Sequence, residues 1–186
     1  LTGDLSGGAR VFGSLVNPGV ETVNIVMTDT NTTFTARLAT LTVTDANAES
    51  IVITGNNGLA LTHAGTALTT VNASGMTGTG ASGVTLTVGA LTTDSVAQGG
   101  TGNDTLNFAS SLAIVTMTGG AGVDTLTGGT VADSITGGEG ADVITGSAGN
   151  DAIILTETTA AIDKVVFSGA AATNALTVTA NGVDVI

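Results

Sequence analysis

The sequence predicts an all-β fold, a right-handed parallel β-helix or β-roll solenoid. Residues 119–154 form four nine-residue repeats without a gap, GGAGVDTLT, GGTVADSIT, GGEGADVIT and GSAGNDAII. Elsewhere, short strand-like segments alternate with turns, and no stretch has helical periodicity. Repeats of this kind indicate small units that bury their apolar side chains only by stacking on their neighbours, so we expect a stack of successive coils.

Each repeat divides into a glycine-rich turn and a three-residue strand. Glycine adopts positive φ without steric cost, so the turn bends sharply and directs several carbonyl oxygens at one point. The triplets TLT, SIT and VIT favour short strands, whose middle side chain faces inward because strand neighbours alternate. These inward residues are predicted to be Leu126, Ile135, Ile144 and Ile153.

The aspartates of the repeats are predicted to stack. If two repeats complete one coil, Asp124 lies against Asp142, and Asp133 against Asp151. Strands about 4.8 Å apart leave two carboxylates repelling by roughly 3 kcal/mol at an effective dielectric near 20. Burying one Leu or Ile side chain stabilises the fold by only about 1.5–3 kcal/mol, and ordering a glycine-rich turn costs conformational entropy. The stack therefore needs a cation.

Calcium is the predicted cofactor, because carboxylate and carbonyl oxygens suit calcium better than zinc or copper. Metal binding and folding would then be one coupled event. An upstream copy, GGTGNDTLN at residues 99–107, adds Asp104, and Asp163 is a further candidate beyond the repeats. The candidate metal-ligating residues are Asp104, Asp124, Asp133, Asp142, Asp151, Asp163, Gly100, Gly102, Gly120, Gly122, Gly129, Gly138, Gly140 and Gly149.

Two repeats depart from the pattern. Val131 stands where its turn needs a glycine, and a β-branched residue at positive φ would be strained; Ser147 replaces a glycine in the last turn. The turn that carries Asp133 is therefore the weakest predicted calcium site. The alternative interpretation of the repeats is a flexible Gly/Asp-rich linker, but four copies in phase argue against it.

Composition excludes several classes of function. The 186 residues carry a net charge of −12 with only three Lys and Arg, so no basic patch exists for nucleic acid. No apolar run is long enough to span a bilayer. Without cysteine there is no disulfide clue, which agrees with an extracellular protein held by metal. Because neither Met nor a signal peptide opens the chain, we expect a fragment or processed product.

Residues 1–98 are predicted to form solenoid coils without regular repeat turns. Residues 1–10 resemble the tail of a preceding repeat, with Asp4 a possible ligand or part of a frayed end. The predicted strands are 20–27, 38–44, 51–54, 59–62, 68–72 and 84–88, separated by turn-forming residues. Their spacing also fits an antiparallel sandwich; we favour the solenoid, since the repeats need coils stacked upstream.

The repeat region 99–154 contains one irregular coil, and residues 155–186 are predicted to continue the solenoid. Segment 108–118 replaces one repeat with an apolar strand over 112–117, and Asp104 to Asp124 is 20 residues where two repeats need 18. Asp104 is still expected to stack beneath Asp124. Segments 161–167 and 175–179 are the last predicted strands.

No catalytic function is expected. His63 is the only histidine, so neither a HExxH zinc site nor a Ser-His-Asp arrangement can be assembled, and no GxSxG or P-loop occurs. Because it follows an alternating strand, His63 is expected at the surface or in a turn.

The repeats resemble the calcium-binding nonapeptides of RTX proteins, G-G-x-G-x-D-x-U-x. Phrases such as GVETVNIVMTDTNTTF and QGGTGNDTL closely resemble the C-terminal, lattice-forming region of Caulobacter-type bacterial surface-layer (S-layer) proteins, over roughly residues 19–151. This resemblance implies type I secretion, folding outside the cell with calcium, and assembly into a two-dimensional lattice. It also implies attachment to lipopolysaccharide through an N-terminal region that these residues do not include.

Three functional hypotheses follow. The first is an extracellular, self-assembling S-layer or filament subunit whose main partner is another copy of itself. Calcium between acidic surfaces would bridge copies, with Asp29, Asp45, Asp94 and Glu139 as candidates, although each is more simply a solvated turn residue. The second is an adhesin or binding segment that presents flat Thr-rich faces, even to ice. The third is an RTX module accessory to a secreted enzyme.

Overall fold

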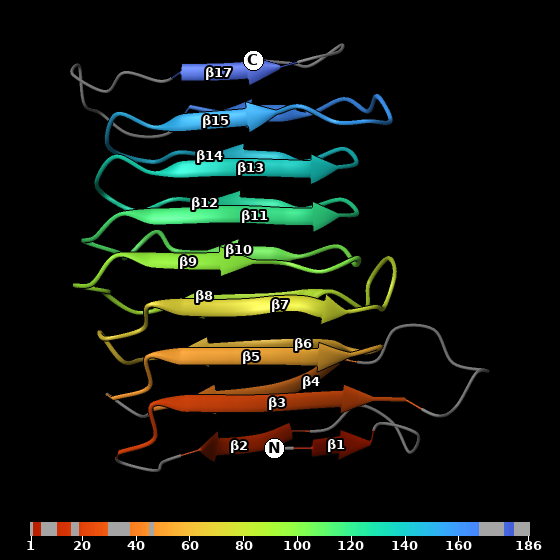
Figure 1. Ribbon diagram of the computed structural model, residues 1–186, viewed down its shortest axis with the longest axis vertical. Coiled ribbons are helices and arrows are strands. Elements are labelled where there is room, and N and C mark those ends of the chain that lie inside the picture. The colour runs from red at the N-terminus through yellow and green to blue at the C-terminus, as the bar shows by residue number, and fades with distance from the viewer. Residues whose placement is uncertain are drawn as a thin grey trace.

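The computed structural model describes residues 2–4, 11–15, 19–29, 38–44, 47–167 and 177–180. Figure 1 shows these residues wound into a tall stack of coils, with one strand of each coil on the near face and one on the far face. Within the described residues, every element is a strand. The predicted ligand Asp4 lies in β1, but its side chain, like Asp45, lies outside the described part.

The described part of the chain contains seventeen strands, which form two sheets. The nine-stranded sheet contains, in spatial order, β1 (Thr2–Asp4), β3 (Thr22–Thr28), β5 (Ser50–Gly55), β7 (Thr70–Met76), β9 (Ser95–Gln98), β11 (Val115–Ala121), β13 (Ser134–Glu139), β15 (Ala152–Leu155) and β17 (Thr177–Ala180). The eight-stranded sheet contains β2 (Val11–Leu15), β4 (Leu38–Val43), β6 (Gly58–His63), β8 (Val84–Val88), β10 (Thr105–Asn107), β12 (Thr125–Thr127), β14 (Val143–Thr145) and β16 (Lys164–Val166).

Each strand pairs in parallel with the strand two places along the chain, as a coil requires. Leu106 of β10 lies opposite Leu126 of β12, which lies opposite Ile144 of β14. Leu126 and Ile144 are separated by 18 residues, whereas the irregular coil separates Leu106 and Leu126 by 20. The all-β parallel solenoid is thus confirmed, and the antiparallel sandwich is excluded for the described strands.

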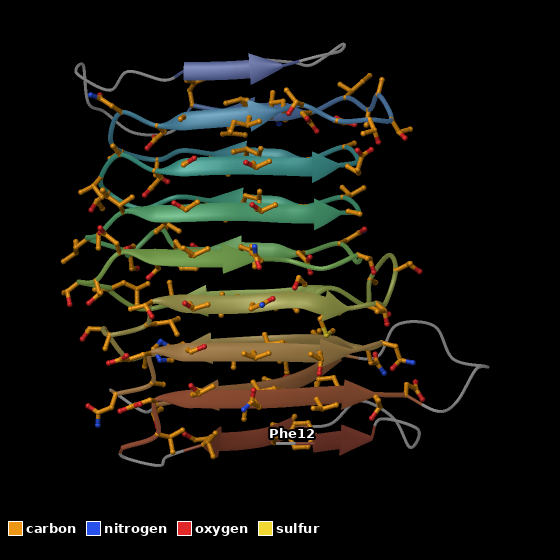
Figure 2. All side chains as sticks on the ribbon, viewed as in Figure 1. Phe12 is labelled. Carbon is orange, nitrogen blue, oxygen red and sulfur yellow. The ribbon has the colours of Figure 1, made fainter. Side chains whose placement is uncertain are left out.

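The core is a thin layer of aliphatic side chains between the two sheets. The four predicted inward residues, Leu126, Ile135, Ile144 and Ile153, are all fully buried. Most residues beside them in the strands are threonine or serine, while Val143, Ala152 and Ile154 are apolar. Figure 2 shows the outward side chains along the stack. At the N-terminal end, the labelled Phe12 packs against the same core while remaining partly exposed.

The predicted upstream strands are found, and most of their ends shift by one or two residues. The turn predicted over residues 73–75 is wrong, because β7 continues through these residues to Met76. β2 and β9 were not predicted, because Val11–Leu15 contains a glycine and Ser95–Gln98 has only two apolar residues. What places β9 is the coil: Ser95 lies opposite Val115, at the same 20-residue step as the neighbouring coils.

The predicted strand over 112–117 is partly wrong. The strand begins at Val115, while Leu112 and Ile114 are 57% and 46% exposed. The preceding residues turn instead, because the Ser111 hydroxyl accepts from the Ala113 N–H at 3.3 Å and the Asp94 carboxylate accepts from the Ile114 N–H at 3.0 Å. These side-chain hydrogen bonds stabilise a turn at residues 111–114, where a strand was predicted.

The prediction for His63 is also wrong. His63 is 1% exposed and ends strand β6, opposite Val43 and Val88 in the neighbouring coils. The predicted strand ended at residue 62, whereas β6 includes His63 and its alternation points this side chain inward after Leu59 and Leu61.

We expect Phe108→Ala to lower the free energy of unfolding by about 3–5 kcal/mol, because Phe108 is fully buried and its removal leaves a cavity. Leu112→Ala, four residues on at an exposed position, is expected to change it by less than about 0.5 kcal/mol. Urea unfolding of both variants in calcium-saturated buffer measures the difference. Equal losses would mean that this coil is not packed as described.

Candidate calcium site

The turns lie on the two long edges where the sheets meet. On one edge, which we call the first edge, the turns run from the nine-stranded sheet to the eight-stranded sheet; they include residues 99–104, 119–124 and 137–142. The second edge holds the turns that run back, including 128–133 and 146–151. Two repeats per coil therefore place alternate repeats on opposite edges, as predicted.

The aspartates of the first edge form a continuous ladder. The Asp104 N–H donates to Asp124 Oδ1 at 2.7 Å, and the Asp124 N–H donates to Asp142 Oδ1 at 2.8 Å. The Asp142 N–H in turn donates to Asp163 Oδ1 at 2.8 Å. All four side chains are 0–1% exposed. We call these four residues the aspartate ladder; each carboxylate joins its own coil to the coil before it.

The second edge carries a shorter version. The Val115 N–H donates to Asp133 Oδ1 at 2.8 Å, and the Asp133 N–H donates to Asp151 Oδ1 at 3.0 Å. The predicted stacking of Asp124 on Asp142 and of Asp133 on Asp151 is therefore what the structure shows. Asp163 joins the ladder although no glycine-rich turn precedes it.

The first glycine of each turn leaves room for the carboxylate. A Cβ added at Gly119 would lie 2.3 Å from Asp124 Oδ2 and 2.4 Å from the Gly137 carbonyl oxygen. Gly137 and Gly146 hold the same relation to Asp142 and Asp151, at 2.5 and 2.4 Å. Only a residue without a side chain allows a carboxylate and a backbone carbonyl of the next coil to approach together.

Positive φ occurs at the second and fourth turn positions of three loops. Gly120 and Gly122 have φ of 118° and 127°, and Gly138 and Gly140 have 111° and 116°. In the last loop, Ser147 and Gly149 take these positions at 73° and 127°. Ser147, which stands where the pattern has a glycine, is the one non-glycine residue at positive φ within the described ranges.

The predicted strain at Val131 is absent. Neither Gly129 nor Val131 has positive φ, so loop 128–133 follows a different path that avoids the steric conflict. Asp133 is also fully used by the protein, since its Oδ2 accepts from the Gly129 N–H at 2.5 Å. Gly100 and Gly102 lack positive φ as well, and Asp104 Oδ2 accepts from the Gly100 N–H at 2.6 Å.

Two ladder carboxylates keep an oxygen for a cation. Asp124 Oδ2 and Asp142 Oδ2 are buried and have no hydrogen-bond partner. A buried carboxylate oxygen without a partner costs several kcal/mol, and a hard cation removes that cost. Among the described residues, no three carboxylate or imidazole groups gather to hold a metal by themselves. Backbone carbonyls of the glycine turns would therefore complete the shell, and the residues present fit calcium.

Burial raises the pKa of every aspartate in the repeats. The pKa of Asp124 rises to about 7, first because burial disfavours the charged form and then because Asp104 and Asp142 are like-charged neighbours. Burial likewise raises the pKa of Asp142 to about 7, helped by Asp163 and Glu157, and that of Asp133 to about 6. The fold thus holds charged oxygens that need a counter-ion near neutral pH.

The acids proposed as bridges between copies make contacts within the chain. Asp29 Oδ2 accepts from the Asn57 side-chain amide at 3.3 Å, and Asp94 accepts from the Ile114 N–H. Glu139 accepts from the N–H groups of Thr158 and Thr159 at 2.7 and 3.0 Å. Each of them holds a turn of its own chain.

Sequence reasoning missed Glu157. This residue follows β15, and burial, together with the like-charged Asp163, raises the pKa of its carboxyl group. It belongs to no repeat, so the nonapeptide pattern gave no reason to select it. The available signal was its spacing, since Glu157 stands 18 residues after Glu139, which is one regular coil.

These features define a calcium-binding parallel β-roll. The family described as the RTX calcium-binding nonapeptide repeat (4 copies) matches residues 92–107 and 118–153. These two segments are RTX calcium-binding repeats, and the match supports the predicted RTX family and calcium as the cofactor. No curated protein and no solved structure matches the chain. In the described residues, no helix is long and apolar enough to cross a membrane.

We expect Gly119→Ala to weaken calcium binding and to destabilise the calcium-bound fold by about 1–3 kcal/mol, because the added methyl group collides with Asp124 Oδ2 and the Gly137 carbonyl. Gly89→Ala is the control, since its nearest atom would be 3.3 Å away and its φ is not positive. Calcium titration followed by thermal unfolding compares the two. Indistinguishable variants would contradict the tight packing of the first glycine.

Stability without calcium is expected to fall as pH rises. Asp124 and Asp142 have an ordinary pKa of 3.8 and a folded pKa of about 7, so folding favours their protonated forms. The stability they contribute is complete below 3.8 and is lost as pH rises through about 7. Calcium needs the deprotonated forms, so its stabilising effect should grow over the same interval.

Chemical denaturation in calcium-depleted buffer and in excess calcium, at about pH 5 and about pH 8, measures both trends. A calcium-free chain that is more stable at the higher pH would contradict the assignment.

Proposed function

We propose that this chain is a structural segment of an extracellular protein that calcium stiffens and that assembles with its own copies into an S-layer lattice or a filament. The observation that carries the proposal is the aspartate ladder, which runs without a break through Asp104, Asp124, Asp142 and Asp163. RTX repeat proteins are generally secreted, which agrees with a cell-surface location.

The ladder supports a mechanical role. Its carboxylates link the successive coils from Asp104 to Asp163 along one edge, so neutralising them stiffens this whole part of the stack and not a single point. Repeat solenoids gain stability from each interface between neighbouring units, and a cation between two coils strengthens such an interface directly. A segment that is flexible before export and rigid outside the cell is suited to a secreted structural protein.

Charge and exposed apolar residues support self-assembly. The chain carries a net charge of −12, so copies repel one another until a divalent cation screens or bridges them. Large apolar side chains are nevertheless exposed along the turn edges: Leu112, Val123, Ile162 and Phe167 are 51–66% exposed. Scattered exposed apolar residues on both edges provide contact points once repulsion is removed. The proposal assigns the chain no catalytic activity.

A second candidate is a binding segment that presents a threonine face. Thr85, Thr105 and Thr125 lie directly opposite one another on successive strands, and Thr127 lies opposite Thr145. This regular stacking forms a flat, hydroxyl-rich surface on the eight-stranded sheet. It favours a binding role only if copies of the chain do not associate.

Calcium titration by far-UV circular dichroism, followed by electron microscopy of the same sample, tests the proposal. We expect the β-sheet signal and ordered assemblies to appear together with calcium and to disappear with chelator. A chain that folds with calcium but stays monomeric would contradict self-assembly and favour the threonine-face function.

The double variant Asp124→Asn/Asp142→Asn is expected to raise the calcium concentration needed for folding by about tenfold or more, because it removes two ladder charges. The control Glu21→Gln/Glu49→Gln removes the same charge from two exposed side chains and should leave that concentration nearly unchanged. An equal shift in both would mean that net charge, and not the ladder, controls folding.

A further inference from the structure

Half of the exposed large hydrophobic residues lie on one face of the stack. In the described part of the chain, eight such residues are exposed. Four of them lie on the outer face of the eight-stranded sheet or where this face borders the first edge; they are Val11 (82% exposed), Leu38 (42%), Val123 (51%) and Ile162 (58%). Two belong to the N-terminal coils and two to the C-terminal coils, so this face carries apolar side chains towards both of its ends.

The alternation along the strands places these four side chains on the same surface. Val123 and Ile162 each precede a buried aspartate, and Leu38 precedes a buried alanine. Because successive side chains point to opposite faces, each of the three points outward with the residue two places further on. Val11 lies opposite the outward Thr40 of the neighbouring strand.

Small uncharged side chains fill the threonine face, by which we mean the outer face of the eight-stranded sheet together with this border. One outward row crosses six strands, from β4 to β14; its members are Thr42, Thr62, Thr87, Asn107, Thr127 and Thr145. Figure 1 shows the strands of each sheet stacked above one another in nearly the same direction, so the surface that they present is flat.

The threonine face carries little charge, although the chain as a whole carries −12. In the described strands of the eight-stranded sheet, Lys164 is the one residue with a formal charge. The described acids that are not buried lie instead at the two edges; they are Glu21, Asp29, Glu49, Asp94, Glu139 and Glu157. Two copies of this acidic chain therefore repel least when faces, and not edges, come together.

A second group of exposed apolar residues is less suited to such a contact. Val96, Leu112 and Ile114 lie near the second edge of the nine-stranded sheet. The exposed Asp94 lies among them, and its carboxylate accepts from the Ile114 N–H at 3.0 Å. A symmetric contact at this place would bring the carboxylates of two copies together, which opposes association.

The threonine face is also large enough for a specific contact. Eight strands about 4.8 Å apart span about 34 Å, and five residues at about 3.3 Å each span about 16 Å. Two copies in full contact thus bury about 1,100 Å² in total, just above the roughly 1,000 Å² expected of a specific interface.

We propose that two copies of this chain associate through their threonine faces, with the two stacks antiparallel. The inference rests on the proposed function, because it names the surface for the self-association proposed above. In this arrangement β4 lies over β14 of the second copy, so Leu38 lies between the partner's Val123 and the partner's Ile162. The apolar ends of the two faces thus cover each other.

Lys164 decides between the two symmetric arrangements. With parallel stacks, each strand would lie over its own copy, and Lys164 would meet the partner's Lys164. With antiparallel stacks, β16 lies over β2 and the two ammonium groups are at opposite ends of the interface. The two-fold axis then passes between β8 and β10, which brings Thr85 of β8 close to the partner's Thr85.

A charge placed at Thr85 tests the interface, because it meets its own copy across the axis. Thr116→Glu is the control for Thr85→Glu, since Thr116 is an equally exposed threonine on the nine-stranded sheet. In sedimentation experiments with excess calcium, we expect Thr85→Glu to associate at least about tenfold more weakly than the parent and Thr116→Glu to match it. An equimolar mixture of Thr85→Glu and Thr85→Lys is expected to regain association.

Cross-linking covers the case in which Thr85→Glu fails to fold. The chain contains no cysteine, so Thr85→Cys and Thr116→Cys each carry a single thiol and no new charge. With a short thiol cross-linker in calcium, we expect Thr85→Cys to give covalent dimers and Thr116→Cys to remain mainly monomeric. Equal cross-linking of the two variants would overturn the proposed face.

The outcomes separate this inference from the proposed function. If the parent associates in calcium and Thr85→Glu associates equally well, the threonine face is not the interface, while self-assembly stands. If the parent forms dimers that depend on Thr85 but no lattice or filament, the interface is supported and the proposed assembly is wrong. A folded parent that stays monomeric overturns both.

Discussion

The fold depends on placing like charges on top of one another. Four aspartates of the first edge are buried in line, and each is fixed by a backbone N–H of the coil before it. These hydrogen bonds favour the charged carboxylates, but burial is the larger effect at Asp124 and Asp142 and raises the pKa of both. Two of the oxygens remain without donors. The structure is therefore complete only with protons or cations, and this condition connects folding to the medium around the protein.

Glycine makes this arrangement sterically possible. Gly119, Gly137 and Gly146 stand where a Cβ would touch a carboxylate, and Gly120 and Gly138 where it would touch the carbonyl of the adjacent turn. Thin coils with small turns leave little apolar area per residue. In the described residues, aliphatic side chains fill this core together with Phe108 and the partly exposed Phe12. The small glycine turns also place both carboxylates and backbone carbonyls at the edges, where one cation can contact two coils. Stiffness and metal binding thus come from one geometric device.

The region before the repeats uses other means for the same purpose. Asn56 and Asp29 exchange two hydrogen bonds between adjacent coils, from the Asp29 N–H to the Asn56 side chain at 2.7 Å and from that side chain back to the Asp29 carbonyl at 3.0 Å. Neutral amides need no counter-ion, so these coils do not share the charge problem of the ladder. Calcium dependence is therefore expected to be concentrated in the repeat region, with the upstream coils stacked on it through continuous sheets.

The repeats alone predict the parallel solenoid, the stacking of Asp124 on Asp142, and the inward residues Leu126, Ile135, Ile144 and Ile153, because a strict nine-residue period fixes which residues recur at the same place in each coil. Where that period fails, pairing between coils sets the structure. β9 and the burial of His63 follow from pairing with neighbouring coils, which local alternation does not encode. Asp163 likewise meets Asp142 through the pairing of β16 with β14, across an irregular turn whose path no repeat specifies. The local sequence pattern sets the strands and turns of each coil, and strand pairing between coils sets which side chains from distant turns come together.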